Sequence, residues 1–384
     1  MKSLRSRQVH LDFHTSELMP DVGSMFDEKQ FQHALKLGHV NSITIFAKCH
    51  HSWSYYPTKI GMPHPTLKSD LLGCQIRACH EIGVHCPIYM TVGWSANDAE
   101  THPEWCARNI DGTIATCGFD LSANAETPKP IVSWKFMCPN DGYRSLILAQ
   151  TRELCQAYPA DGFFYDICFG PALCYCDSCR DGMARSGVNM DEVDAVKNFT
   201  TAKWVNLMRG CESIIKSFHP EASIFFNGGA NMYTPQEVLD KQTHLELEDL
   251  PTTWGGYDKF PLRARSLRRH GKPYLAMSGK FHTTWGEFGG FKHPDAIRYE
   301  AASMVAYGAS CSFGDQAHPS GAMDLDTYRN IGVGYNYVRK IEEYGIGAAP
   351  LTNLALIPGT GPKQAADAMA HAEGVSSMLL ETQR

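Results

Sequence analysis

The chain has 384 residues, of which 43% are hydrophobic and 20% charged, and its formal net charge is −6. This is ordinary globular composition, and the length allows one large α/β domain and part of another. The acidic balance argues against nucleic acid or an anionic membrane as the main partner. No apolar run approaches the ~20 residues that a membrane span requires, so we expect no membrane partner.

The chain carries 14 cysteines, but they are scattered through apolar segments rather than spaced as a disulfide framework. The first residues, MKSLRSRQVHLDFH, are basic without the apolar stretch of a secretory signal. We therefore expect a cytoplasmic protein with reduced thiols.

Strand-like and helix-like patterns alternate along most of the chain. Strands are predicted at 8–13, 42–47, 86–92, 162–165, 223–226, 243–248, 274–277 and 309–313. Helices are predicted at 28–37, 65–82, 141–158, 191–218, 294–307 and 324–344. Alternation of this kind predicts parallel βα units, and about eight of them predict a (β/α)8 TIM barrel over residues 1–348.

Two segments lie outside this pattern. Residues 95–137 form a long insertion, predicted to be irregular and functional, because structureless loops of that length are uncommon in compact domains. Residues 349–384 contain a short apolar strand at 354–357 and a helix from 375. We interpret 349–384 as the beginning of a second α/β domain that this sequence does not complete.

The stretch 161–179, DGFFYDICFGPALCYCDSC, contains the strongest functional signal. An apolar run ends on one carboxylate, Asp166, at the end of a strand where barrel enzymes hold their catalytic groups. A charge in so buried a place is costly unless it is paired or used. Asp166 is the first candidate catalytic residue, and a structural Asp that caps the loop is the alternative.

A second carboxyl group would complete the pair that a glycosidase uses. Three glutamates are candidates for the proton donor, ranked Glu248, Glu246 and Glu287 by their distance from a predicted strand end. Retaining glycosidases separate the two carboxyl groups by ~5–5.5 Å, and inverting ones by ~6.5–9.5 Å.

Polar and aromatic side chains gather at the other predicted strand ends. Imidazoles can donate to or accept from a polar ligand, and aromatic faces suit the apolar face of a sugar. The candidate substrate-binding residues are Asp12, His14, His50, His51, Trp94, Trp285 and His318. Core packing or an ordinary surface histidine is the alternative for each.

Three thiols, Cys174, Cys176 and Cys179, lie within six positions, and Cys138 precedes the helix that leads to the 162–165 strand. An antiparallel helix and strand can bring Cys138 beside the other three. Four thiolates would form a closed, structural zinc site, so no cofactor is expected for catalysis. A packing cluster, or Cys106 as the fourth ligand, is the alternative.

The residues quoted above resemble two groups of glycoside hydrolases. A strand ending in Lys48-x-His50-His51 and another ending in Tyr165-Asp166 resemble the α-L-fucosidases of glycoside hydrolase family 29. The cysteine pattern and the C-terminal segment are similar to the zinc site and the trimerisation domain of family 42 β-galactosidases. With QVHLDFHTSE and HLELEDLP added, the chain looks most like family 151 and the hypothetical glycosyl hydrolase 6 group.

The resemblance implies a retaining exo-glycosidase that releases terminal fucose from oligosaccharides. It implies Asp166 as the nucleophile, His50 and His51 as fucose ligands, and a glutamate as the acid/base. A homo-oligomer of the full-length chain, with a trimer as the expected form, is the implied assembly. The alternatives are a β-galactosidase or other deoxy-sugar hydrolase, a non-catalytic sugar-binding barrel, and a metal-dependent hydrolase with an open zinc.

Overall fold

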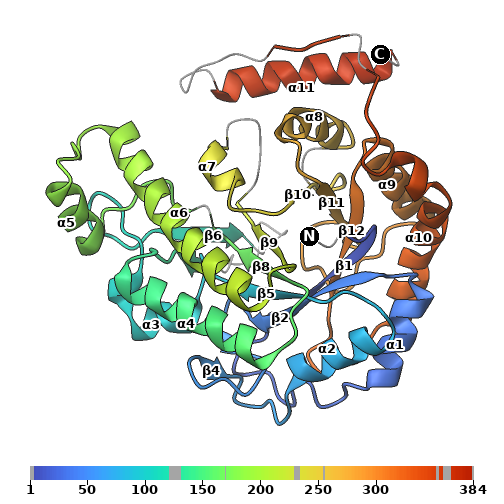
Figure 1. The fold of residues 1–384 in the computed structure, drawn as a ribbon, viewed down its shortest axis with the longest axis horizontal. Helices are drawn as coiled ribbons and strands as arrows, with labels where there is room; N and C mark the ends of the chain where they lie inside the picture. The colour runs from blue at the N-terminus through green and yellow to red at the C-terminus, as the bar shows by residue number, and fades with distance from the viewer. Residues whose placement is uncertain are drawn as a thin grey trace, which may run out of the picture.

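The computed structural model describes residues 4–120, 131–168, 170–228, 234–253, 256–351, 354–357 and 365–382. Eight parallel strands form a nearly closed ring in the order β10-β11-β12-β1-β2-β5-β8-β9 (Figure 1). Their bounds are β1 (Arg7–Asp12), β2 (Ser42–Lys48), β5 (Pro87–Thr91), β8 (Gly162–Asp166), β9 (Ser223–Phe226), β10 (Leu245–Glu248), β11 (Tyr274–Gly279) and β12 (Ser310–Gln316). The predicted (β/α)8 barrel is confirmed.

The ring closes between β9 and β10 through Thr243, which precedes β10. The backbone N–H of Thr243 donates to the carbonyl oxygen of Ile224 over 2.9 Å. The Thr243 hydroxyl in turn accepts the N–H of Ile224 over 2.8 Å. Because one residue makes both bonds, β10 and its carboxylates are held beside β9, one strand away from β8.

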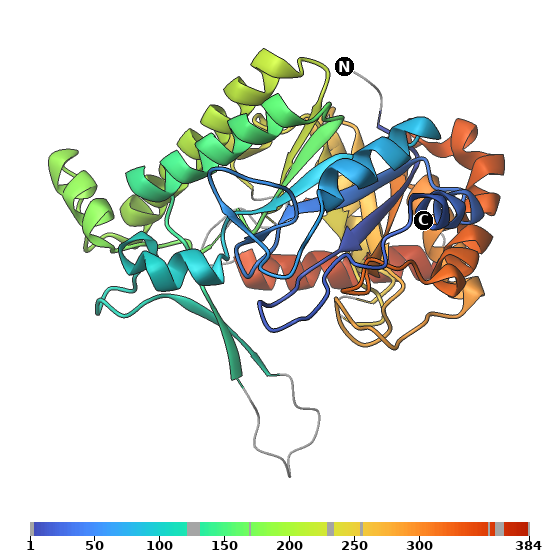
Figure 2. The same cartoon turned by 90° about the horizontal axis from the view of Figure 1, so that it is seen from below.

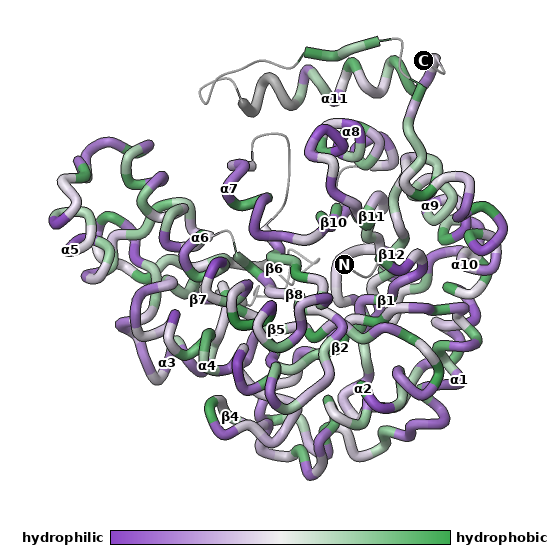
Figure 3. The backbone as a smooth tube through the Cα atoms, in the orientation of Figure 1, coloured by the Kyte–Doolittle hydropathy of each residue, from purple (hydrophilic) through white to green (hydrophobic). Residues whose placement is uncertain are grey.

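One helix follows each barrel strand and packs on the outside of the ring. These helices are α1 (Glu28–Leu37), α2 (Leu71–Glu81), α4 (Asp141–Ala157), α6 (Val193–Phe218), α7 (Gln236–Leu239), α8 (Lys259–Leu267), α9 (Pro294–Ala306) and α10 (Leu325–Gly345). Helix α1 buries Phe31, Ala34 and Leu35, the spacing that places side chains on one face. In Figure 3 hydrophobic and hydrophilic segments alternate along these helices, as expected for elements with one face on a core.

Further elements lie in the connections of the barrel, all but η2 between a barrel strand and the helix that follows it. They are β3 (Trp53–Ser54), β4 (Met62–Pro63), α3 (Ala96–Thr101), η1 (Pro103–Trp105), β6 (Thr116–Asp120), β7 (Ile131–Lys135), α5 (Asp177–Arg185) and η2 (Arg268–His270). The predicted irregular insertion is therefore partly regular, with a helix, a 3-10 turn and an antiparallel hairpin of β6 and β7. Helix α2 begins at Leu71 rather than at Pro65, because the Asp70 side chain accepts the N–H of Gly73 and caps it there.

The C-terminal segment differs from its prediction. Residues 354–357 are not a strand, and no described strand pairs with them. An isolated extended segment has no partner for its backbone groups, so apolar composition alone does not make it a strand. Helix α11 (Ala365–Glu381) covers the predicted helical residues and packs beside α8 (Figure 1). None of the described helices is long and apolar enough to cross a bilayer.

Candidate active site

Asp166 ends β8 and lies inside the mouth of the barrel, 8% exposed. The next residue, Ile167, has φ of 58°, a left-handed conformation that is strained for a β-branched side chain. A Cβ on Gly93 would lie 1.7 Å from the Ile167 carbonyl oxygen, so only glycine permits this close approach after β5. The backbone therefore turns sharply at the carboxylate and leaves it at the strand end.

Both oxygens of Asp166 accept hydrogen bonds. Oδ1 accepts the side-chain amide of Asn227 over 2.8 Å and the N–H of Ile167 over 2.9 Å. Oδ2 accepts the Tyr89 hydroxyl over 2.6 Å and lies 3.7 Å from Nε2 of His50. Burial raises the pKa of Asp166, and the donors from Tyr89 and Asn227 oppose this rise because they favour the carboxylate.

His50 follows β2, and its hydrogen bonds determine which ring nitrogen carries the proton. The Thr91 hydroxyl donates its proton to the carbonyl oxygen of Trp94 over 2.6 Å. Nδ1 of His50, 2.7 Å from the same hydroxyl, must therefore donate to it. Burial lowers the pKa of His50 well below its usual value, so the ring is neutral. Nε2 is then a bare acceptor that faces Asp166.

Glu248 ends β10, which is two strands away from β8 in the barrel, with β9 between them. Burial raises the pKa of Glu248 to about 7, and the negative charge of Asp166 adds to this rise. A carboxyl group with this pKa keeps its proton below about pH 7 and loses it above, so it can donate and take back a proton near neutrality. The site thus contains one carboxyl group that accepts three hydrogen bonds, that of Asp166, and a second whose raised pKa suits it to donate a proton, that of Glu248. This difference is the pattern that separates a nucleophile from a proton donor.

The other two candidate glutamates lie elsewhere. Glu246 is two residues earlier on the same face of β10, and lines a small internal cavity with Gln8 and Ser42 at the start of their strands. Its Oε1 bonds to Nε2 of His244 over 2.9 Å. Glu287, in the loop after β11, accepts the backbone N–H groups of Thr283 and His282, and these bonds lower its pKa.

The candidate substrate residues at the end of β1, Asp12 and His14, form a compact group beside His50. The His14 ring stacks on the His50 ring at 4.1 Å, and its Nδ1 accepts the backbone N–H of His50 over 3.1 Å. Nε2 of His14 lies 3.5 Å from Asp12 Oδ1, and the Trp285 indole donates to Asp12 Oδ2 over 2.7 Å. Asp12, which is 3% exposed, therefore orients His14 and holds the Trp285 loop over the barrel.

The remaining candidates divide between the mouth and a peripheral loop. Trp94 makes an edge contact with His50 at 5.1 Å, and His51, the next residue along the chain, is half-buried. His318 lies in the exposed loop after β12, where its Nδ1 is 2.8 Å from the Ser320 hydroxyl of the same turn.

A buried ion pair supports the loop that carries the histidines. Nζ of Lys48, at the end of β2, lies 2.6 Å from Oδ2 of Asp98 in α3. The Ser95 hydroxyl donates to the same oxygen over 2.6 Å, and the Ser52 hydroxyl accepts the N–H of Asp98. Ser52 has φ of 76°, so this network holds a strained turn directly after His50 and His51.

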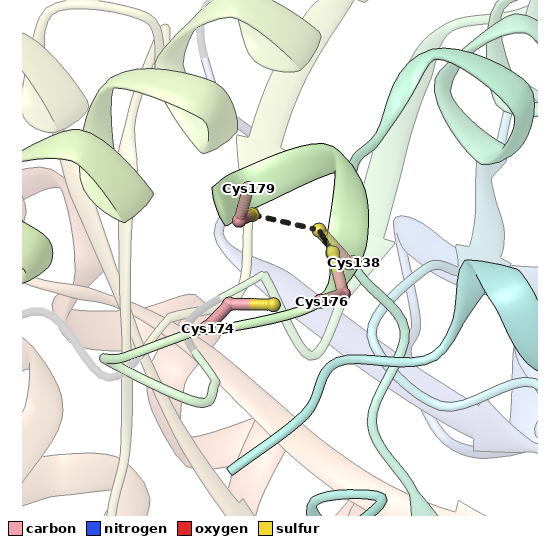
Figure 4. Close-up of side chains that lie close together, drawn as sticks. All are labelled: Cys138, Cys174, Cys176 and Cys179. Carbon is pink, nitrogen blue, oxygen red and sulfur yellow. Dashed lines mark hydrogen bonds between the residues drawn. The ribbon is translucent and has the colours of Figure 1, made fainter. Parts of the chain in front are cut away.

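Cys138, Cys174, Cys176 and Cys179 meet as predicted, with all four sulfurs within 4.8 Å of one another (Figure 4). Cys138 Sγ is 3.6 Å from Cys179 Sγ and 3.7 Å from Cys176 Sγ. Four sulfurs about 2.3 Å from a central zinc would be about 3.8 Å apart, so the donor set and spacing fit tetrahedral zinc. Cys106 lies outside the cluster.

Tyr89, Asn227 and Trp134 are the site residues absent from the sequence prediction. Asn227 directly follows a predicted strand, so the strand-end rule could have identified it. Tyr89 lies within a strand and has the pattern of a core residue. Trp134 reaches His50 only because the insertion folds back as a hairpin, with 5.4 Å between the rings.

Comparisons with known proteins show which proteins this chain is similar to. Residues 27–167 match the family described as "Hypothetical glycosyl hydrolase 6". The chain is 42% identical to α-L-fucosidase isoenzyme 2 from Paenibacillus thiaminolyticus, with a TM-score of 0.83. That match covers 91% of this chain but 52% of the other, so the chain spans about half the length of that protein. The predicted resemblance to family 151 and the hypothetical glycosyl hydrolase 6 group is confirmed.

More distant structures share the fold alone. α-L-fucosidase isoenzyme 1 from Paenibacillus thiaminolyticus is 15% identical with a TM-score of 0.53. That match covers 90% of this chain and 76% of the isoenzyme. A family 29 α-L-fucosidase from Bacteroides thetaiotaomicron is 14% identical with a TM-score of 0.51, covering 83% and 61%. The comparison with curated proteins finds no match.

Proposed function

We propose that this chain is a retaining glycoside hydrolase that releases terminal α-L-fucose, with Asp166 as nucleophile and Glu248 as acid/base. The observation that carries the proposal is the pair of carboxyl groups, Asp166 and Glu248, with different surroundings. Asp166 is buried at a barrel strand end with Tyr89 and Asn227 as donors. Glu248 has its pKa raised to about 7, in part by the charge of Asp166. The choice of sugar rests on the resemblance to α-L-fucosidases.

Oδ2 is the attacking atom of Asp166, because Oδ1 already accepts two hydrogen bonds and Oδ2 accepts one. It forms a bond to the anomeric carbon while the bond to the leaving oxygen breaks and Glu248 transfers its proton to that oxygen. Glu248 then removes a proton from water, the water oxygen attacks the same carbon, and the Asp166 carboxylate leaves.

The unprotonated Nε2 of His50 would accept a hydrogen bond from a hydroxyl group of the bound sugar. Nε2 and Oδ2 of Asp166 are 3.7 Å apart, and both are acceptors. A substrate hydroxyl between them supplies the donor that this arrangement lacks. His50 thus positions the sugar, while His14 and Asp12 hold the His50 backbone from behind.

The four-cysteine cluster would hold a zinc ion of structural role. Its ligands are all sulfur, which leaves no position for a water or substrate. The ion would tie Cys138, before α4, to the Cys174–Cys179 segment that follows β8. It would therefore fix the loop just beyond the nucleophile strand, and the chemistry itself needs no cofactor.

The direct test uses 2-deoxy-2-fluoro-α-L-fucosyl fluoride, which forms the glycosyl-enzyme faster than water can remove it. Peptide mass spectrometry should find the label on Asp166, and aryl α-L-fucosides should be hydrolysed in preference to aryl β-D-galactosides. Hydrolysis of the galactosides instead would favour the β-galactosidase alternative. Fucose binding without turnover of any substrate would favour a sugar-binding barrel.

A further inference from the structure

The hairpin of β6 and β7 lies at the mouth of the barrel and projects away from it (Figure 2). Its base is joined to the end of β5. The backbone of Phe136 forms a bridge with that of Trp94, and the N–H of Met137 donates to the Gly93 carbonyl over 2.8 Å. The base of the hairpin is therefore hydrogen-bonded to the segment that directly follows β5, so a side chain borne there has a fixed position relative to the site.

Trp134, on β7, is the hairpin residue that faces the histidines. Its ring makes edge contacts with His50 at 5.4 Å and His51 at 5.2 Å. It lies nearly parallel to the Trp94 ring, at 10° and 6.1 Å between centroids. The Trp134 side chain is half-buried, so part of its indole surface remains accessible.

The order of contacts places Trp134 one side chain farther from the nucleophile than His50. Nε2 of His50 lies 3.7 Å from Asp166, and Trp134 touches His50 and then His51. The sugar that bonds to Asp166 must bring its anomeric carbon to ~3–3.5 Å from the carboxylate before reaction. A residue one layer outward is then in position for the group attached to that sugar.

We propose that Trp134 is the aromatic platform for a pyranose ring on the leaving-group side of the cleaved bond. This rests on the proposed function and specifies its substrate as fucose linked to a second sugar. A pyranose presents a face of C–H groups that packs on an aromatic ring, and Trp offers the largest such surface. The platform stands on the insertion between β5 and α4, and such loops at the carboxyl ends of barrel strands are the part of a barrel that varies to set specificity.

The test compares two kinds of substrate, a glycosyl fluoride and fucosyl disaccharides, that differ only in the leaving group. α-L-fucosyl fluoride has no ring to contact Trp134, whereas α-L-fucosyl disaccharides of (1→2), (1→3), (1→4) and (1→6) linkage do. With Trp134→Ala, kcat/KM for the disaccharide that the parent hydrolyses best should fall by about 10- to 100-fold. For the fluoride it should change by less than about twofold, and Trp134→Phe should recover much of the disaccharide activity.

Trp105→Ala is the matched control, since Trp105 lies in the same insertion and stacks on His102 at 3.8 Å, away from His50. Trp105→Ala should leave kcat/KM unchanged for both the disaccharide and the fluoride. Thermal unfolding of the variant would show any general destabilisation. Equal losses on both substrates with Trp134→Ala, no loss on either, or a parent that hydrolyses the fluoride but no disaccharide would each overturn the platform alone. A parent that hydrolyses neither substrate would overturn the proposed function, and the platform with it.

Discussion

The hydroxyl of Tyr89 donates a 2.6 Å hydrogen bond to Oδ2 of Asp166, while its ring lies flat against Phe46 at 3.6 Å between centroids. Because stacking on Phe46 holds the Tyr89 ring in place, Tyr89→Phe should remove the hydrogen bond and leave the position of the ring unchanged. Burial raises the pKa of Asp166, and the Tyr89 bond counters this. Since the nucleophile must be ionised, the acid limb of the kcat/KM profile should move to higher pH in the variant.

Tyr143→Phe is the control for that experiment. Tyr143 is also fully buried, but its hydroxyl donates to the carbonyl oxygen of Val92 rather than to a carboxylate. Its loss should cost about 1 kcal/mol of unfolding free energy and leave the acid limb in place. An acid limb that stays in place with Tyr89→Phe would mean that Tyr89 does not stabilise the reacting carboxylate.

Replacement of Asp166 should abolish hydrolysis. Asp166→Ala removes the atom that bonds to the sugar, and kcat for an aryl fucoside should fall at least ~10³-fold. Azide, which can occupy the vacated space and attack the anomeric carbon, should restore turnover and yield a fucosyl azide detectable by NMR. Normal turnover by the alanine variant would show that another group is the nucleophile.

Glu248 should set the basic limb of the pH profile. It donates a proton to the leaving group, so the rate falls as the pH rises above its pKa of about 7. Glu248→Gln should remove that limb and lower kcat most for poor leaving groups, since dinitrophenolate departs without a proton. Glu246→Gln, which changes a carboxylate facing the cavity near Gln8, should retain the basic limb. The reverse result would exchange the roles of the two glutamates.

The cysteine cluster should bind close to one zinc per chain, measurable by plasma emission spectroscopy of purified protein. Cys176→Ser should reduce the zinc content and lower Tm by more than ~5 °C, because the binding free energy of a structural zinc contributes to folding. Cys106→Ser is the matched control, since Cys106 is equally buried but outside the cluster. Full zinc content in Cys176→Ser would remove that thiol from the ligand set.

The barrel itself was predictable because its signal is local. Apolar runs such as 162–165 and 223–226 end in polar residues, and each strand is followed by a helical pattern, so the parallel topology follows from chain order. Helix α1 was predicted at its observed bounds, Glu28–Leu37. Where a competing local signal was overlooked, as with the Asp70 cap of α2, the predicted boundary was wrong.

The sequence alone determined the eight-unit barrel, the carboxylate at the end of its fourth strand, and the four cysteines that could meet. Each of these depends on periodicity, chain order or spacing. Only the tertiary structure decided that Tyr89 and Asn227 bind Asp166, that Glu248 and Glu246 occupy different layers, and that Trp134 reaches His50. Those relations depend on burial and on contacts between distant segments, and the charge state of a carboxyl group is set by neighbours that chain order does not reveal.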